Sequence, residues 1–104
     1  MERKFEKGTI VQHFKREKLT KEELEKEPNK YLFEIMGTAR HTETEEELIL
    51  YIPLYDAPCA KGVDYAARPV DMFMSEVDHE KYPDIKQKYR FEETDIVPVK
   101  KLTK

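Results

Sequence analysis

The sequence has one cysteine, no tryptophan, three glycines and no long hydrophobic run. A single cysteine, Cys59, cannot form an intramolecular disulfide, and it excludes the CxxC-based zinc sites of small metal-binding domains. The longest apolar run, residues 48–54, contains Pro53 and is far shorter than a membrane-spanning helix requires. We therefore expect no membrane-buried segment.

The first seven residues carry charge but lack a following apolar stretch and a small-residue cleavage site. The sequence thus predicts no secretory signal. Together with the lack of cysteine pairs, this indicates a reducing compartment, and we expect a cytoplasmic protein. Nineteen Lys and Arg residues against 22 Asp and Glu residues give a net charge of −3. That balance disfavours non-specific binding to duplex DNA, which depends on neutralising phosphates.

The common catalytic motifs are also missing. The sequence contains no GxSxG, no glycine-rich phosphate loop followed by lysine, no HExxH and no dinucleotide-binding fingerprint. Cys59 has no neighbouring base in the sequence, although a catalytic thiol requires one to lower its pKa. We therefore assign no catalytic residue, no metal ligand and no cofactor, and the sequence favours a binding role over catalysis.

What is present is an alternation of apolar and polar residues that is typical of short β-strands. Residues 9–14 begin with β-branched side chains, and their polar ends indicate an edge strand. Residues 47–55 are apolar on both faces, as expected of a central strand covered on each side. Between them, residues 31–40 alternate strictly, which predicts an antiparallel hairpin with residues 47–55. The side chains predicted on one face of that strand are Tyr31, Phe33, Ile35, Gly37 and Ala39.

A short helix is expected between the first two strands. Thr20 and Glu23 have the spacing of a capping box, and Leu19 and Leu24 have that of a hydrophobic staple. Pro28 ends the helix after about two turns, because a proline in a helix interior removes a hydrogen bond and clashes with the preceding turn. We predict that this helix packs Leu24 against the β core and covers one open end of it.

These elements fit one domain, because a chain of 104 residues has room for only one hydrophobic core. Pro69 begins a one-turn helix that ends at Phe73. The strands are predicted to form a small curled antiparallel sheet or an SH3-like barrel, because barrel closure removes exposed sheet edges. The expected divisions are an N-terminal extension over residues 1–7, a β-rich domain over residues 8–97 with the inserted helix at 20–27, and a flexible tail over residues 98–104.

Several short segments also carry a resemblance to a known family. They are His13-Phe14-Lys15, residues 31–37, Ala39-Arg40-His41-Thr42-Glu43-Thr44, Glu46-Glu47-Leu48, Leu54-Tyr55 and Arg68-Pro69-Val70-Asp71-Met72-Phe73. Together they resemble the bacterial family known as domain of unknown function 1653, over about residues 8–93. Two insertions, residues 16–29 and 56–64, depart from the family pattern. The resemblance implies a compact β-rich fold and a bacterial cytosolic origin, and it carries no established activity.

The candidate binding residues are arginines, histidines and tyrosines. Arg68 precedes Pro69, so its backbone is extended and its side chain is directed away from the following turn. Its forked donors suit an anionic ligand, but an ion pair with Asp71 or Glu76 also explains it. The residues that we assign to a ligand site are His13, Arg40, His41, Tyr51, Tyr65 and Arg68.

Each of the other candidates has a structural alternative. His13 suits proton transfer or ligand binding, but a histidine in a strand more often hydrogen-bonds a neighbouring loop. The segment 41–44 fits a turn in which Thr42 and Glu43 satisfy loose backbone donors. Three tyrosines suit stacking on a base or ring, and packing at the core and its rim explains them equally. These tyrosines are Tyr51, Tyr55 and Tyr65.

Three hypotheses follow. The first is a non-catalytic binding module for a polar or anionic ligand, which is a nucleotide, a single-stranded nucleic acid or a peptide. The second is a small enzyme in which His13 or His41 pairs with Glu43 as acid and base. The third is a structural protein that forms a homodimer through the edge strand at residues 9–14. The binding module is the leading hypothesis.

Overall fold

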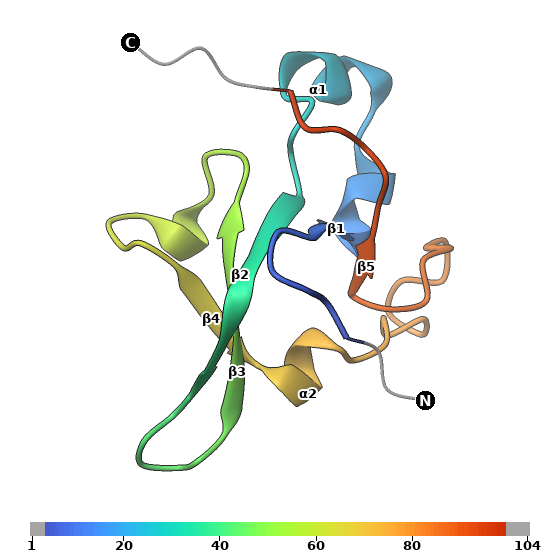
Figure 1. The fold of residues 1–104 in the computed structure, drawn as a ribbon. Helices are drawn as coiled ribbons and strands as arrows, with labels where there is room; N and C mark the ends of the chain where they lie inside the picture. Colours follow the sequence, from blue (N-terminus) through green and yellow to red (C-terminus); the bar gives the residue numbers. More distant parts are fainter. Residues whose placement is uncertain (1–3, 100–104) are drawn as a thin grey trace, which may run out of the picture.

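The computed structural model describes residues 4–99, which form a five-stranded antiparallel sheet in the order β4-β3-β2-β1-β5 (Figure 1). The strands are β1 (Ile10–His13), β2 (Leu32–Arg40), β3 (Glu47–Pro53), β4 (Ala66–Pro69) and β5 (Phe91–Glu93). The predicted mainly β fold and its curled antiparallel sheet are confirmed. Within the described residues β4 and β5 do not pair, so the sheet is not closed into a barrel.

Short helical segments connect the strands. They are the 3₁₀ helix η1 (Phe14–Lys18) and helix α1 (Lys21–Lys26) between β1 and β2, the 3₁₀ helix η2 (Pro58–Ala60) between β3 and β4, and helix α2 (Val70–Phe73) directly after β4. The inserted helix and the one-turn helix expected from the sequence are thus both present. Among the described residues, no helix is long and apolar enough to cross a membrane.

Helix α1 begins where the sequence predicts. The Thr20 hydroxyl accepts a hydrogen bond from the Glu23 N–H at 3.1 Å, and the Glu23 carboxylate accepts one from the Thr20 N–H at 2.8 Å. The predicted packing of Leu24 against the β core is wrong. Leu24 is half-buried, and α1 contributes no residue to the core clusters of the described chain, because it has only one apolar side chain. The helix lies beyond the N-terminal end of β2, next to the C-terminal segment of the described chain (Figure 1).

Strand β1 is an interior strand, and the prediction of an edge strand at residues 9–14 is wrong. It pairs with β2 on one side and with β5 on the other. The second partner comes from the far end of the chain, which the local pattern of β1 cannot reveal. A homodimer through residues 9–14 therefore has no open edge there, since the two ends of the described sheet are β4 and β5.

A β-bulge in β2 changes the face on which its later side chains lie. The register pairs Ile35 with Tyr51 but Gly37 with Leu50, so β2 has one extra residue at this point. Gly37 has a φ of 140°, which glycine adopts more readily than other residues. The alternation predicted beyond Ile35 is therefore wrong, and Arg40 lies on the face of Ile35 instead of the opposite one.

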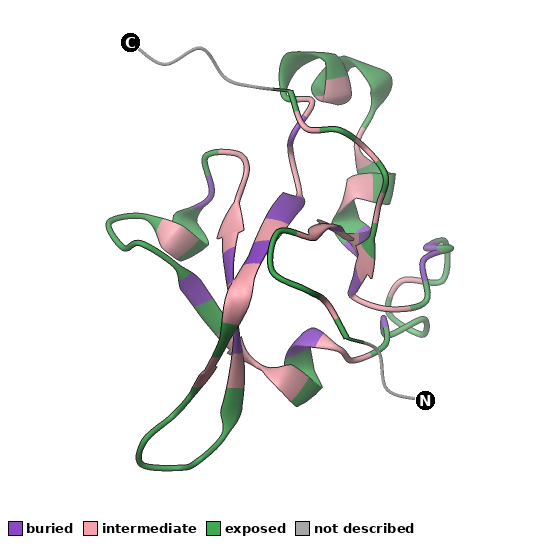
Figure 2. Ribbon diagram, in the orientation of Figure 1, coloured by how far each residue is buried: buried purple, intermediate pink, exposed green. Residues whose placement is uncertain are grey.

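The main core lies on the inner face of the curled sheet, where all five strands and α2 contribute buried side chains (Figure 2). These side chains are Val11, Phe33, Ile35, Ile49, Tyr51, Ala66, Phe73 and Phe91. The rings of Phe73 and Phe91 stack with their centroids 4.1 Å apart, which joins α2 to β5. Burial of this apolar surface is the main driving force for the fold.

Side chains near both ends of the described chain contact the domain. Phe5, in the predicted N-terminal extension, meets the Phe73 ring edge-to-face with the centroids 6.2 Å apart. At the other end, the buried Asn29 amide accepts a hydrogen bond from the Val99 N–H at 2.8 Å and donates one to the Val99 carbonyl at 2.7 Å. Residues 1–3 and the rest of the predicted flexible tail, residues 100–104, lie outside the described residues.

Candidate functional site

Arg68 on β4 is the centre of the candidate site. It lies opposite Ile49 of β3, a core residue, so its side chain is on the inner face of the sheet. The half-buried guanidinium reaches across the curled sheet to β5, where its carbon lies 5.6 Å from the centroid of the Phe91 ring. This distance is within the range of a cation–π contact.

Tyr51 on β3 contacts the same arginine. The Arg68 guanidinium lies beside the Tyr51 hydroxyl and interacts with it. Burial raises the pKa of Tyr51, and the positive charge of Arg68 opposes that rise. The Tyr51 ring also packs against Phe73 and Phe91, with centroid distances of 5.1 and 5.9 Å. Arg68 is therefore positioned by a hydroxyl and a ring that are themselves part of the core.

His13 at the end of β1 lies beside this arginine, surrounded by aromatic rings. Its imidazole stacks on Phe14 at 4.4 Å, meets Phe91 edge-on at 5.0 Å and lies 5.7 Å from Tyr31. Phe91 thus contacts both His13 and Arg68, and it joins the two predicted site residues. The rings also limit the access of water to the imidazole.

The surroundings of His13 keep its ring neutral at pH 7. Burial, followed by the positive charges of Lys15, Arg68 and Arg90, lowers the pKa of His13 to about 4. Its Nδ1 accepts a hydrogen bond from the Lys15 N–H at 3.1 Å, which places the proton of the neutral ring on Nε2. The charges that act on His13 are all cationic, and no carboxylate of the described residues offsets them. The surroundings of His13 are therefore locally electropositive although the protein has a net charge of −3.

Two further tyrosines extend this face, Tyr31 directly before β2 and Tyr55 shortly after β3. Tyr55 lies edge-to-face with Tyr31 and with Phe33, at centroid distances of 5.7 and 5.6 Å. Burial raises the pKa of Tyr55 well above its usual value. Tyr55 also borders two cavities, of about 160 Å³ beside Asn29 and about 330 Å³ beside the loop 56–64. We define the inner-face site as His13, Tyr31, Tyr51, Tyr55 and Arg68.

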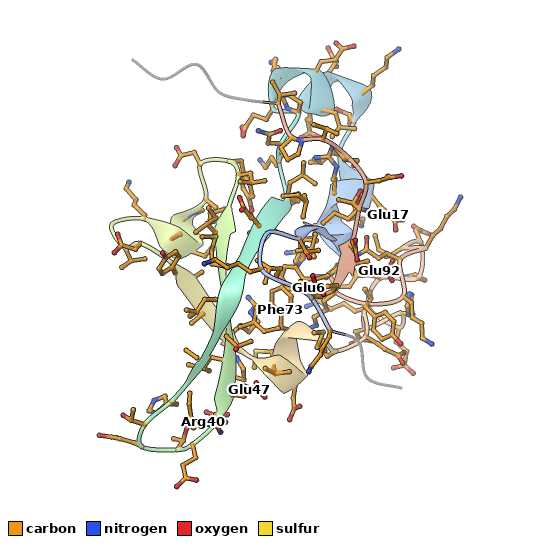
Figure 3. The ribbon with its side chains drawn as sticks, in the orientation of Figure 1. Glu6, Glu17, Arg40, Glu47, Phe73 and Glu92 are labelled. Carbon is orange, nitrogen blue, oxygen red and sulfur yellow. The ribbon has the colours of Figure 1, made fainter. Side chains whose placement is uncertain are left out.

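The structure does not bring the other predicted residues to this site. Arg40 lies at the far end of the β2–β3 hairpin, well away from Phe73 in the core (Figure 3). Its guanidinium donates a hydrogen bond to the Glu45 carbonyl at 3.2 Å. His41 is exposed in the same hairpin, and Tyr65 before β4 has 48% of its surface exposed. Of the six predicted residues, the site unites His13, Tyr51 and Arg68.

The tip of the hairpin is a side-chain-stabilised turn, as the structural alternative predicted, but other side chains are the acceptors. His41 Nδ1 accepts hydrogen bonds from the N–H groups of Glu43 and Thr44 at 3.2 and 3.3 Å, and the Thr44 hydroxyl accepts one from the Glu46 N–H at 3.2 Å. The prediction that Thr42 and Glu43 supply the acceptors is wrong, because the imidazole of His41 already occupies the donors. His41 therefore meets the backbone of Glu43 and not its carboxylate.

The sequence pattern missed two rings of this region, for different reasons. The alternation of residues 31–40 puts Tyr31 on the same face as Phe33, so the sequence contains a signal for the position of Tyr31. No local pattern indicates the position of Phe91 in the site, because that position depends on the pairing of β5 with β1. Among residues 4–99, no group of three or more His, Cys, Asp and Glu side chains could hold a metal ion, and Cys59 is exposed.

These features define a small, open antiparallel-sheet domain whose inner face carries an arginine, a neutral histidine and three tyrosines. The chain belongs to the family described as "Protein of unknown function (DUF1653)", whose model matches residues 9–93. The match runs from just before β1 to the end of β5, so it includes every strand and the whole inner-face site. It confirms the resemblance seen in the sequence. No curated protein and no solved structure shows a significant match.

Proposed function

We propose that this domain is a non-catalytic binding module that takes an anionic group at Arg68. The observation that supports this best is the position of the guanidinium, which lies 5.6 Å from the Phe91 ring and beside a neutral His13. The guanidinium also lies beside the Tyr51 hydroxyl and interacts with it. Its in-plane donors suit the two oxygens of a phosphate or carboxylate.

The tyrosines of the inner-face site narrow the class of ligand. Tyr31 and Tyr55 are half-buried, so part of each ring remains accessible. Stacking of a base on an aromatic side chain contributes about 1–3 kcal/mol. A nucleotide or a short single-stranded nucleic acid would use both the arginine and the rings, whereas an acidic peptide would use mainly the arginine. The cytoplasmic location expected from the sequence stays a prediction.

The hypothesis of an acid–base enzyme has no comparable support. His13 and His41 each accept hydrogen bonds from backbone N–H groups. Among the described hydrogen bonds, neither imidazole meets a carboxylate. An acid–base pair needs its two groups within hydrogen-bond reach, directly or through one water, so this arrangement favours binding over catalysis.

The experiment is a thermal-shift screen of nucleotides, single-stranded oligonucleotides and acidic peptides, followed by calorimetry of each hit with variants. Arg68→Lys keeps the positive charge but loses the paired N–H donors of the guanidinium, and we expect it to weaken binding about tenfold. Arg68→Ala is expected to weaken it further. Arg40→Ala is the matched control at the hairpin tip, and its affinity should equal that of the parent.

Because Arg68 contacts core rings, the unfolding midpoint of each variant is measured without ligand. Only variants that unfold cooperatively are compared for binding. Arg68→Lys is the more informative change, because an ammonium group can still lie over the Phe91 ring. If Arg68→Ala binds every hit as tightly as the parent, Arg68 is not the anion site and the proposal is wrong.

A further inference from the structure

Strand β4 ends the sheet with few charges along its edge, and its protection is limited to its short length and to Pro69. Within the described residues it pairs with β3 alone, and no backbone hydrogen bond from outside the sheet reaches Tyr65 or Ala67. Natural edge strands usually carry charges that prevent pairing with another chain. On β5, the other end strand, two of three residues are glutamates. Over residues 65–69 the one charge is that of Arg68, and it lies over Phe91 on the inner face.

Pro69 determines which backbone groups of β4 point outward. It is opposite Leu48 of β3, but proline has no N–H to donate, so its backbone faces away from β3. Orientation alternates along a strand in an antiparallel sheet. Ala67 and Tyr65 therefore also direct their N–H and C=O groups outward, while Arg68 bonds to β3. The outer edge of β4 offers two complete residues for pairing.

We propose that β4 pairs antiparallel with β4 of a second copy of this chain, with Ala66 at the two-fold axis. In this register Tyr65 is opposite Ala67 of the partner subunit, and the two such pairs form four backbone hydrogen bonds. Centring the axis on Ala67 would instead place Tyr65 opposite Pro69 of the partner subunit, whose missing N–H removes a donor from each outer pair. That register also reaches four hydrogen bonds, two at the central Ala67 pair and one at each outer pair, so the choice of the register centred on Ala66 depends on the side chains.

Side chains support the same register. Tyr65 and Val63 are 48% and 59% exposed, unusual for large apolar side chains, and both lie next to this edge. The register covers Tyr65 with Ala67 of the partner subunit and brings Val63 toward Pro69 of the partner subunit. It also places Asp64 opposite Arg68 of the partner subunit, so opposite charges face each other and like charges do not.

The short edge implies a weak dimer. A standard stable interface buries about 800 Å² per partner, and a strand of four residues with its flanking loop offers less. The dimer is therefore expected to form as the protein concentration rises, with a dissociation constant on the order of 100 μM. Its surface is the outer edge of β4, and it meets the inner-face site only where Asp64 is opposite Arg68 of the partner subunit.

Sedimentation equilibrium of the full chain tests this. The weight-average mass of the parent should rise with concentration from 12.4 kDa toward twice that value. Ala67→Pro removes an outward N–H that β3 does not use, so the variant should keep its unfolding midpoint and remain monomeric. Ala67→Ser keeps the N–H and is the matched control, which should associate like the parent.

Amide exchange of the parent gives a second readout that requires no variant. The N–H groups of Tyr65 and Ala67 should exchange more slowly at high concentration, whereas the Arg68 N–H, bonded to β3, should be protected at every concentration. A chain that stays monomeric at all concentrations overturns the proposal. So does a dimer in which exchange at Tyr65 and Ala67 is independent of concentration.

Discussion

His13 is the residue whose chemistry the fold changes most. In the sequence it is a candidate proton carrier, but the structure encloses it in rings beside three cations. Its Nδ1 also accepts the Lys15 N–H at the start of η1. A proton on Nδ1 would break that hydrogen bond and add a positive charge beside Arg68. In this environment the imidazole of His13 remains neutral at pH 7.

We predict that protonation of His13 destabilises the protein in acid. The pKa falls from 6.5 to about 4 on folding, so the unfolded chain takes up the proton first as the pH drops. The contribution of His13 to stability is complete above pH 6.5 and is lost as the pH falls toward 4. After allowance for the partial exposure of the ring, the loss is about 2 kcal/mol.

Urea unfolding across this pH range measures the effect. His13→Asn keeps an acceptor for the Lys15 N–H but does not titrate, so its free energy of unfolding should fall less steeply between pH 6.5 and pH 4. Equal slopes for the parent and His13→Asn would contradict the assignment.

Among the elements, helix α1 is stabilised by its N-terminal cap and not by packing on the core. We predict that Thr20→Ala costs about 1 kcal/mol of stability, because it removes the acceptor for the Glu23 N–H. Leu24→Ala should cost less than about 1 kcal/mol, since its half-buried side chain leaves no core cavity. Denaturant midpoints compare the two variants. A larger loss for Leu24→Ala would show that α1 is docked after all.

Glu17 joins η1 to the connection that precedes β5. Its carboxylate accepts hydrogen bonds from the N–H groups of Lys86 and Gln87, at 2.9 and 2.7 Å. We predict that Glu17→Gln loses one of these bonds, costs about 1 kcal/mol, and speeds amide exchange at Lys86 and Gln87. Glu22→Gln makes the same charge change on the exposed face of α1. If both variants exchange alike at these two amides, the Glu17 contact does not hold the connection.

At the scale of the whole molecule, the sequence predicted what local patterns encode. The Thr20 cap, the turn after Pro69 and the hairpin of β2 with β3 all depend on neighbouring residues. The pairing of β1 with β5 joins opposite ends of the chain, so neither the interior position of β1 nor the role of Phe91 could be predicted. Gly37 within a strand pattern is a signal for a bulge, but the pattern does not show where the extra residue lies, and the bulge moves Arg40 to the other face.

The candidate site follows the same division. Residue type alone identified Arg68 and Tyr51 as suited to an anionic or aromatic ligand, and the register of β3 with β4 places them together. Arg40 and His41 are of equally suitable type, but the length of the hairpin places them far from the inner-face site (Figure 3). Convergence of side chains depends on the sheet as a whole and is not a property of a single strand.

The most direct test of the account is an NMR titration of the parent and of Arg68→Ala with inorganic phosphate, adenosine monophosphate and a short single-stranded oligonucleotide. The account predicts saturable shifts for the amides of His13, Tyr51, Arg68 and Phe91 with at least one of these probes, and their loss in Arg68→Ala. Shifts that centre on the hairpin around His41, or that persist unchanged in Arg68→Ala, would contradict it.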